Sequence, residues 1–596
     1  MNKPQIRLGL VAQPLRKRLQ PNQTAASIPE PNCQSTKKPT AMKKHVLTML
    51  LITATSTVHA DPAIDALRKE RAELAAKPRP IFYANDGNDA YARVNAGTRE
   101  TSTTLPKDIP LVNKIVERLN SSGEETDQVR LKFLTRRALQ LVGTQVSTHA
   151  FNVVTASFPV VNCLRTKVGL PTHERAALLF DQGLCPLQMS IDLAREADME
   201  IFMTLRMNEI HDGFGASHSL DLDNNAVKAD HRDWLMQRTD KEPKRHGWLA
   251  FNYEIPEVRN MYLRFLREMC ENYDIDGLDL DFMRFPILFR TVYLGQPATP
   301  EQTEILTGFL RDVRAMTEEV GLKRGRPILI NARVADSLAL NDAQGMDVKT
   351  WIKADLIDTV ALGGRSMVAL YETSIGELKP LGKPVYITLE TSIGAANPRG
   401  NDGGTPPVQL RLSAEAARGR AAEAHGSGAD GIYVLNYHLM RDYAPTLRQI
   451  GSPETLVGTD KDYFASWGLG ESFGVPYEPF RTMETLCPAS PRDLKPGEPG
   501  EATFPMFEDF EAARTMGKTP ALILRLQIQG ISSAAGLTLA LNGSPLDLAG
   551  AKIQDGWLSV PIPESTLIRG RNKLEATLAP GTAPATLQDL VLAVRY

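Results

Sequence analysis

Two aspartates carry the clearest chemical signal in this sequence. Asp279 and Asp281 lie two residues apart in the run Asp276-Gly-Leu-Asp-Leu-Asp-Phe-Met-Arg-Phe-Pro286. In a strand, that spacing places both carboxylates on one face. Two acids buried together need a cation, hydrogen bonds or a catalytic reason, because an unpartnered buried charge is costly. Arg284 is one candidate partner, and paired carboxylates suit general acid and base catalysis.

Further polar side chains stand in or directly after other apolar runs. They are Arg206, Asn208, Glu209, His211 and Asp212 at the third run, Asn331 and Arg333 at the fifth, Thr388 and Glu390 at the seventh, and Asn436 and His438 at the eighth. Any one of them alone is typical of a satisfied structural group, but their convergence at one rim would form a site. In the alternative interpretation, Arg206 and Arg333 pair with Asp279 and Asp281, and the acids are structural.

The runs that must position these residues alternate with amphipathic stretches, which is the pattern of βαβ units. The expected strands are 81–85, 146–154, 200–206, 277–282, 328–334, 359–362, 385–389 and 431–436, and the expected helices are 129–141, 187–197, 257–272, 301–319, 348–354 and 412–425. Eight strands with crossover helices predict a (β/α)8 TIM barrel, whose active sites form at the carboxyl ends of the strands. An open doubly wound sheet is the alternative, although no Gly-rich phosphate turn follows the first run.

The pattern changes after a Pro- and Gly-containing stretch at residues 484–504. From Leu522 onward apolar residues alternate with polar ones, and Asn542-Gly543 is a strong hairpin signal. We therefore expect a barrel domain over 61–450, a connecting segment over 451–504 and a small β-sandwich over 505–596. Packing against the barrel is the expected role of the sandwich.

The first 60 residues contain a predicted export signal and an extension before it. Met42-Lys-Lys-His opens an apolar run that ends in Val58-His59-Ala60, which is typical of a secretory signal over 42–60 with cleavage after Ala60. Residues 1–41 are then a non-native upstream extension, and the mature protein is periplasmic or secreted. A disordered leader before a membrane anchor is the alternative. Export permits a disulfide, for which Cys163 and Cys185 are the favoured pair by loop length.

The charge balance bears on partners. Without residues 1–60 the chain has 59 Lys and Arg against 69 Asp and Glu, a net charge of −10. This balance argues against general nucleic-acid binding, which needs an excess of basic residues. We expect no membrane span in the mature chain, and the sequence does not indicate the oligomeric state.

Three segments resemble the glycosyl-hydrolase-like family ten barrels. They are Arg206-Met-Asn-Glu-Ile-His-Asp212, Asn252-Tyr253 with Pro256-Glu-Val-Arg259, and the run Asp276 to Pro286, within a similarity that covers about residues 79–450. The resemblance implies a (β/α)8 fold, export, fusion to β-sandwich modules and hydrolysis of carbohydrate. A weaker likeness to the chitinase-type DGxDxDxE signature has Met283 where the acidic glutamate would stand, which disfavours a chitinase mechanism.

Glycoside hydrolysis requires two carboxyl groups that flank the scissile bond. The best pair is Asp281 with Glu390, and a second arrangement makes Asp281 the nucleophile and Glu209 the acid, with Asp279 nearby. Candidate substrate contacts are the aromatic rings of Trp234, Trp248, Tyr253, Phe289 and Tyr437, and the polar groups of Arg206, Asn208, His211, Asp212, Arg284, Asn331, Arg333 and Asn436.

Two other classes of function stay open. A noncatalytic glycan-binding barrel would fit the presence of Leu280 and Met283 where related enzymes keep functional residues. A metal-dependent hydrolase or a lyase could use the same rim, since Glu209, His211, Asp212, His218 and His231 are close in sequence. No HExxH spacing supports a metal, so we expect neither a metal nor another cofactor.

Overall fold

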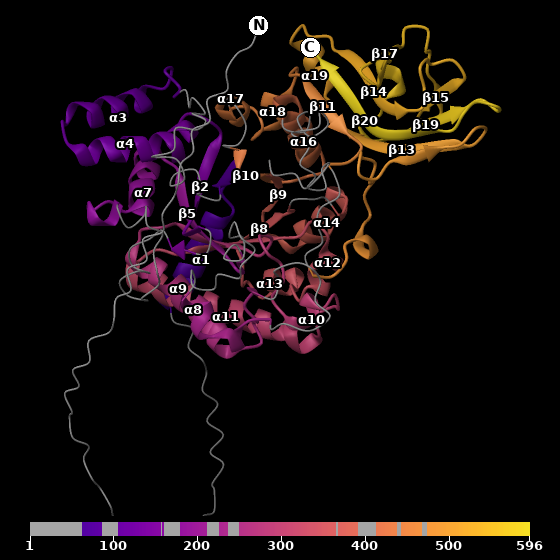
Figure 1. Ribbon diagram of the computed structural model, residues 1–596. Helices are drawn as coiled ribbons and strands as arrows, with labels where there is room; N and C mark the ends of the chain where they lie inside the picture. Colours follow the sequence, from indigo (N-terminus) through magenta and orange to yellow (C-terminus); the bar gives the residue numbers. More distant parts are fainter. Residues whose placement is uncertain are drawn as a thin grey trace, which may run out of the picture. The chain divides into compact units, whose positions relative to one another are not determined.

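The computed structural model describes residues 62–85, 105–155, 158–159, 179–210, 226–236, 249–364, 368–390, 413–437, 443–467 and 474–596. Its central feature is a closed barrel of eight parallel strands (Figure 1). The strands are β1 (Ile81–Asn85), β2 (Val146–Asn152), β5 (Glu200–Arg206), β6 (Gly277–Asp281), β7 (Leu329–Val334), β8 (Thr359–Leu362), β9 (Val385–Glu390) and β10 (Gly431–Leu435). Around the barrel the order is β1-β10-β9-β8-β7-β6-β5-β2, which confirms the TIM barrel and excludes the open sheet.

Helices alternate with these strands. The longer ones are α1 (Pro62–Ala75), α3 (Pro110–Ser121), α4 (Glu125–Arg137), α7 (Pro186–Glu196), α9 (Pro256–Asn272), α11 (Pro300–Arg324), α14 (Tyr371–Leu378) and α16 (Ala414–Gly426). Shorter ones are α8 (Ala226–Asp230), α10 (Arg290–Tyr293), α12 (Leu338–Ala343), α13 (Val348–Lys353), α17 (Tyr443–Leu447) and α18 (Pro453–Leu456). Local sequence sets some of their ends: Thr299 and Gln302 form a capping box before α11, and Gly325 ends that helix with a φ of 74°.

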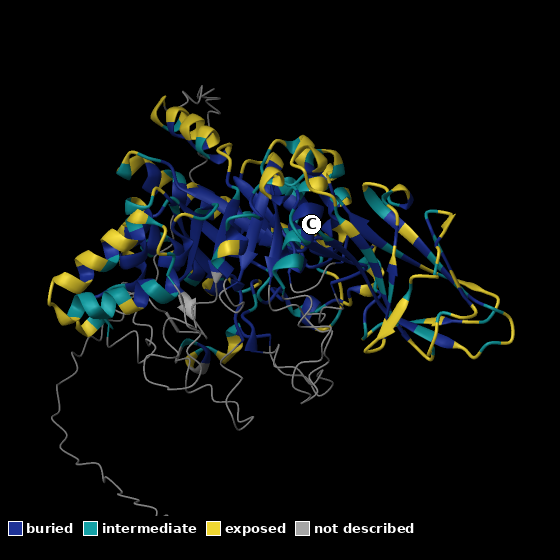
Figure 2. Ribbon diagram, turned by 90° about the horizontal axis from the view of Figure 1, so that it is seen from above, coloured by how far each residue is buried: buried dark blue, intermediate teal, exposed yellow. Residues whose placement is uncertain are grey.

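The barrel interior is layered along the strands. Near their amino ends it is apolar: the ring of Phe82 stacks on Tyr433 with centroids 5.2 Å apart and meets Phe202 edge to face at 5.0 Å. Toward the carboxyl ends the inward positions become polar, with Asp279 beside Asn331 and Asp281 beside Arg333 across the β6–β7 pair. Figure 2 shows the barrel strands as buried and the outer helices as partly exposed. The fold therefore concentrates polar groups at one end of a packed core.

Antiparallel sheets follow the barrel, as expected for the small β-sandwich. One contains β11 (Lys461–Phe464), β12 (Arg492–Leu494), β14 (Ala521–Gln529), β17 (Lys552–Gln554), β18 (Trp557–Pro561) and β20 (Ala585–Arg595), and the other contains β13 (Pro499–Met506), β15 (Leu537–Leu541), β16 (Ser544–Pro545) and β19 (Gly570–Leu578). A short helix, α19 (Phe510–Thr515), joins β13 to β14. The first strands β11 and β12 lie within the residues that the sequence assigns to the connecting segment.

The sheets contact the barrel through α14 and α16. Arg571 on β19 pairs with Glu423 on α16 at 2.7 Å and with Glu372 on α14 at 3.2 Å. The backbone of β11 also lies close to α16, because a Cβ added to Gly419 would come within 2.2 Å of the carbonyl oxygen of Asp462. These contacts agree with the expectation that the sheets pack against the barrel.

Some expectations concern residues outside the described ranges. The signal and extension assigned to residues 1–60 lie outside the described part of the chain. Within that part, no helix combines the length and hydropathy needed to cross a bilayer. The Sγ atom of Cys185 lies 3.4 Å from the hydroxyl of Tyr273. Cys163 lies outside the described ranges, so its pairing with Cys185 stays a prediction.

Candidate functional site

Asp279 lies at the centre of a hydrogen-bonded layer inside the barrel. Its Oδ1 atom accepts a hydrogen bond from Asn331 Nδ2 at 2.7 Å, and its Oδ2 atom accepts from the hydroxyls of Thr204 and Tyr433 at 2.7 and 2.8 Å. Thr359 extends the layer by donating to Asn331 Oδ1 at 2.8 Å. Strands β5, β6, β7, β8 and β10 therefore contribute to one network, which satisfies a carboxyl group that has no exposure to solvent.

The environment of Asp279 changes its acidity. Burial raises the pKa of Asp279 to about 6, and the nearby Asp281 carboxylate adds to the rise. The hydrogen bonds from Asn331, Thr204 and Tyr433 act in the opposite direction because they favour the ionised form. Both carboxyl oxygens of Asp279 accept hydrogen bonds from neighbouring strands, which suits a structural role below the rim.

Asp281 and Glu390 meet at the carboxyl ends of β6 and β9 through one arginine. Arg333 Nη1 lies 3.1 Å from each carboxylate oxygen of Asp281, and Arg333 Nη2 lies 3.0 Å from Glu390 Oε2. All three side chains are almost completely buried. The structure therefore brings together the two carboxylates of the best predicted pair, within the span of a single guanidinium fork.

The charge of Arg333 depends on these partners. Burial alone lowers the pKa of a guanidinium, but the carboxylates of Asp281 and Glu390 outweigh it and raise the pKa of Arg333 above its ordinary value. The guanidinium also lies 5.7 Å from the ring centroid of Tyr433. The alternative interpretation of the sequence is partly met here, since Arg333 does pair with Asp281.

The Asp281 carboxylate receives a second set of donors from the chain that follows β6. The backbone N–H groups of Met283 and Arg284 donate to Asp281 Oδ1 at 2.9 and 3.0 Å. The expected partnership between Arg284 and the aspartates thus includes a backbone hydrogen bond. Two fixed amides and a guanidinium converge on Asp281, an arrangement that favours its ionised form.

Glu209 forms a separate cluster after β5. It pairs with Arg206, and its Oε1 atom accepts from the N–H of Ile210 at 2.8 Å. The buried Lys228 on α8 donates to the backbone carbonyl of Glu209 at 2.6 Å. Glu209 and Arg206 therefore neutralise each other, whereas Arg333 pairs with the acids on β6 and β9.

Several predicted substrate contacts have structural roles instead. Asn208 is fully buried, and its side-chain amide donates to the carbonyls of Phe251 and Ile287 while its oxygen accepts from the N–H groups of Glu209 and Phe251. Tyr253 is also fully buried, and its hydroxyl donates a hydrogen bond to the backbone carbonyl of Met207. Their polar groups bond within the protein, and the buried ring of Tyr253 is not available for the substrate contact that the sequence suggested.

The other aromatic candidates are also largely covered. Phe289 and Tyr437 are buried, and Trp234 is half-buried with its ring stacked on His231 at a centroid distance of 3.8 Å. Burial raises the pKa of the Tyr437 hydroxyl despite the nearby charge of Arg420. In the described part of the chain, the rings predicted by position alone pack into the protein more than they face solvent.

Strand β10 differs from the sequence-based assignment of its faces. The sequence predicts polar residues Asn436 and His438 at the end of this strand. Inside the barrel the hydroxyl of Tyr433 reaches Asp279, so Tyr433 and Leu435 are the inward residues of β10. Asn436 follows the strand with a φ of 61°, a left-handed conformation that asparagine tolerates. Tyr433 was missed because an aromatic residue in an apolar run resembles core, and the tyrosine hydroxyl was its only signal.

The remaining predicted residues lie outside the described ranges. His211, Asp212 and Trp248 are among them, together with His438. Among the residues that the structure does describe, no three His, Cys, Asp or Glu side chains gather as metal ligands. The histidine and carboxylate cluster that motivated a metal hypothesis therefore falls mainly on residues 211–218, where the structure gives no description.

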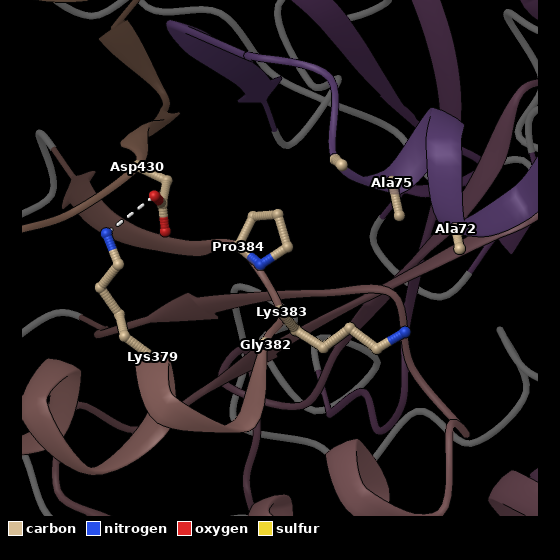
Figure 3. A pocket seen from close by; sticks show the side chains of 8 residues that line it. Ala72, Ala75, Lys379, Gly382, Lys383, Pro384 and Asp430 are labelled. Carbon is tan, nitrogen blue, oxygen red and sulfur yellow. Dashed lines mark hydrogen bonds and ion pairs between the residues drawn. The ribbon is translucent and has the colours of Figure 1, made fainter.

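A hollow of about 320 Å³ lies elsewhere, at the amino ends of β9 and β10 (Figure 3). Ala72 and Ala75 of α1 line one side, and Lys379 and Asp430 form an ion pair of 2.9 Å on the other. Lys383 points into the same region and pairs with Asp355 at 2.6 Å. Because both lysines are paired, this hollow has no excess charge, and it lies at the opposite end of the strands from Asp281 and Glu390.

Comparisons with known proteins show similarity of fold. No protein-family model matches the chain, and no curated protein matches it. Among solved structures, the α-L-fucosidase isoenzyme 2 from Paenibacillus thiaminolyticus is 12% identical with a TM-score of 0.35, and the match covers 63% of this chain and 48% of that one. This chain thus spans about half the length of the fucosidase.

Two further structures match over their whole length. The glycoside hydrolase domain of PgaB (BpsB) from Bordetella bronchiseptica is 11% identical with a TM-score of 0.39, over 63% of this chain and 99% of that one. The chitinase-like agglutinin from Robinia pseudoacacia is 10% identical with a TM-score of 0.32, over 63% and 100%. The barrel is thus distantly similar in fold to glycoside hydrolase barrels and to a lectin.

Proposed function

We propose that the protein hydrolyses glycosidic bonds of an oligosaccharide or polysaccharide at the carboxyl rim of the barrel. The observation that carries the proposal is the pairing of Asp281 and Glu390 across Arg333, which gathers two carboxyl groups from distant strands at one place. Glycoside hydrolysis needs two such groups, one as nucleophile or base and one as acid. A site at the carboxyl ends of the strands is where barrel enzymes perform their chemistry.

The contacts support different roles for the two acids. Asp281 accepts from the backbone amides of Met283 and Arg284 as well as from Arg333, and backbone donors of this kind stay in place during a reaction. The contact between Glu390 and Arg333 Nη2 involves a side chain that a bound sugar can displace. We therefore assign Asp281 as the ionised nucleophile and Glu390 as the acid and base, and this assignment is preferred over Glu209, which pairs with Arg206.

The test is a screen of polysaccharides and chromogenic glycosides with the wild type, Asp281→Asn and Glu390→Gln. Asp281→Asn is expected to lose activity about 10³-fold or more on every glycoside, because no nucleophile remains. Glu390→Gln is expected to lose about 10²–10⁴-fold on a poor leaving group and much less on dinitrophenolate, which needs no proton.

Asp312→Asn, at an exposed position on α11, is the matched control and should keep full activity. Thermal unfolding of each variant separates a chemical effect from a loss of folding. Retention of wild-type turnover by Asp281→Asn or by Glu390→Gln on unactivated substrates would rule out the assignment.

A second candidate function is glycan binding without catalysis. The specific observation in its favour is that Met283, at the position of the chitinase-type acid, packs into an apolar cluster, while Arg333 pairs with both strand acids. Affinity electrophoresis that shows retardation by a glycan, with no release of reducing ends, would select this function over hydrolysis.

A further inference from the structure

A segment between β11 and β12 folds back onto the barrel. We call residues 474–483 the strap. A Cβ added to Gly474 would come within 2.6 Å of Val292 on α10, which shows how closely the strap backbone approaches the chain that follows β6. The N–H of Thr482 donates to the carbonyl of Val368 at 2.9 Å, after β8. The strap therefore contacts rim loops that follow two different barrel strands.

An apolar cluster fastens the strap to the loop after the intervening strand. Val475 and Tyr477 are buried in this cluster together with Ala335, Leu340 and Val368. Ala335 and Leu340 come directly after β7. Because a buried tyrosine contributes a large contact area, Tyr477 is the main apolar anchor of the strap.

Met283 connects this cluster to Asp281. Its side chain packs against the cluster, and its Cε atom would lie 2.9 Å from a Cβ added to Gly364, so the glycine leaves the room that the thioether occupies. Its backbone N–H donates to Asp281 Oδ1, and so does the N–H of Arg284. Met283 thus packs on its side-chain side against the cluster that includes the strap residues Val475 and Tyr477, and its amide donates to the candidate nucleophile.

We propose that the strap positions Asp281: Tyr477 and Val475 hold Met283 in place, and the Met283–Arg284 turn then directs two amides at the carboxylate. Met283 and Tyr477 are positioning residues, since they act on Asp281 through the turn. The effect of the strap on catalysis rests on the proposed hydrolysis. The support of the Met283–Arg284 turn by the strap does not depend on it. The sheets after the barrel therefore contribute to the rim through the segment that joins two of their strands.

Hydrogen exchange of the full chain tests the contact without any substrate. In Tyr477→Ala, amides in peptides that cover residues 282–288 are expected to exchange about tenfold faster or more, because the turn loses its support. Tyr477→Phe keeps the ring and should exchange as the wild type does. Met283→Ala is likewise expected to exchange faster, and Met283→Leu to exchange as the wild type does. This second pair of variants replaces the first if Tyr477→Ala does not fold.

Leu539→Ala is the control for general loss of stability, because Leu539 is buried in β15 of the sheets and belongs to a different apolar cluster from the strap residues. It should leave exchange at residues 282–288 unchanged. Unchanged exchange in both alanine variants, with the fold retained, would overturn the proposal.

Turnover gives the second readout. On a glycoside that the wild type cleaves, Tyr477→Ala and Met283→Ala should lower kcat with little change in KM, and Tyr477→Phe and Met283→Leu should restore it. Equal turnover by all four variants would contradict the proposal that the strap and Met283 position Asp281 for catalysis. If the wild type cleaves no glycoside, the proposed hydrolysis fails, and the exchange measurement still decides whether the strap supports the turn.

Discussion

Arg333 determines the charge balance at the rim, because it pairs with Asp281 and with Glu390 while it is almost completely buried itself. Removing one partner of a buried ion pair leaves an uncompensated charge in a low-dielectric environment. Here the loss of one guanidinium would leave two carboxylates without their shared cation. Arg333 is therefore the residue at which a single substitution should disturb the site most.

Arg333→Met is expected to lower the free energy of unfolding by about 3–5 kcal/mol at pH 7. The reason is that Met conserves much of the side-chain volume but supplies no charge. The measurement is the denaturant midpoint, compared with Arg514→Met, whose partner Glu564 is exposed at the surface. That control should change by less than about 1 kcal/mol. Equal effects of the two substitutions would contradict a buried bridging role.

The raised pKa of Asp279 predicts a pH dependence of stability. Its pKa is about 6 in the folded protein and 3.8 in the reference state, so between these values the folded chain keeps a proton that the unfolded chain has lost. The unfolded state then binds fewer protons, and stability decreases as the pH rises through this range. The loss is complete above pH 6 and amounts to about 3 kcal/mol.

Asp279→Asn removes this titration while it keeps the shape of the side chain. The amide can accept from Asn331 and donate to the hydroxyls of Thr204 and Tyr433, which are able to act as acceptors. The variant is therefore expected to gain up to about 3 kcal/mol relative to the wild type between pH 4 and pH 7. Asp336, whose pKa burial also raises to about 6, is present in both proteins and cancels in the difference. A difference that is flat across this range would contradict the prediction.

At the scale of single residues, the sequence predicts the acids better than their partners. The two-residue spacing of Asp279 and Asp281 was enough to place both on the inward face of β6. Ion pairing depends on which strands are neighbours in the closed barrel. The sequence therefore could not show that Arg333, and not Arg206, bridges the two acids. Tyr433 approaches Asp279 from a strand more than 150 residues further along the chain, and only the closed barrel makes that contact.

At the scale of elements, the backbones of α16 and β11 approach each other closely. Gly419 faces the backbone of Asp462, and a backbone carbonyl cannot rotate away as a long side chain can. Gly419→Ala is expected to lower the free energy of unfolding by about 1–3 kcal/mol through overpacking, although alanine favours helix.

Gly376→Ala on α14 is the matched control, because a Cβ at Gly376 meets nothing within 4 Å. It should raise stability by about 0.5–1 kcal/mol, which is the usual gain from replacing glycine in a helix. The two thermal midpoints should therefore move in opposite directions. A shift of Gly419→Ala in the same direction as the control would show that α16 and β11 have room to separate.

Elements with a strong period were predicted well, and elements defined by tertiary contacts were not. Strands β1, β5 and β8 match their predicted ranges, because apolar β-branched runs with clear breaks mark their ends. Helix α1 was not predicted: its mean hydropathy is low, and Arg71 on its buried face reaches the fully buried Asp358. The strap was assigned to a connecting segment, since no periodic pattern reveals that a loop packs on a distant rim.

At the scale of the whole molecule, Arg571 links the sheets to the barrel through ion pairs with Glu423 on α16 and Glu372 on α14. Its partner Glu423 is 1% exposed, and burial raises the pKa of Glu423 while Arg571 acts to lower it. Arg571→Ala is expected to lower the free energy of unfolding by about 2 kcal/mol, less than for a wholly buried pair because Arg571 keeps some contact with water.

The effect should be smaller at pH 5 than at pH 8, because a protonated Glu423 no longer needs a cation. Unfolding followed at both pH values measures it, and Glu423→Gln in the same background should restore part of the loss. An effect of Arg571→Ala that is independent of pH and of Glu423→Gln would show that the arginine acts through packing alone.

The pairing of β11 with β20 has a consequence for biosynthesis. Lys461 is opposite Val594, so β11 leaves the ribosome long before the strand that will bond to it. During this interval the barrel can close, but the backbone amides and carbonyls of β11 that bond to β20 have no partner. A nascent chain that stalls or is cut before β20 would present this open strand to its neighbours and would tend to aggregate.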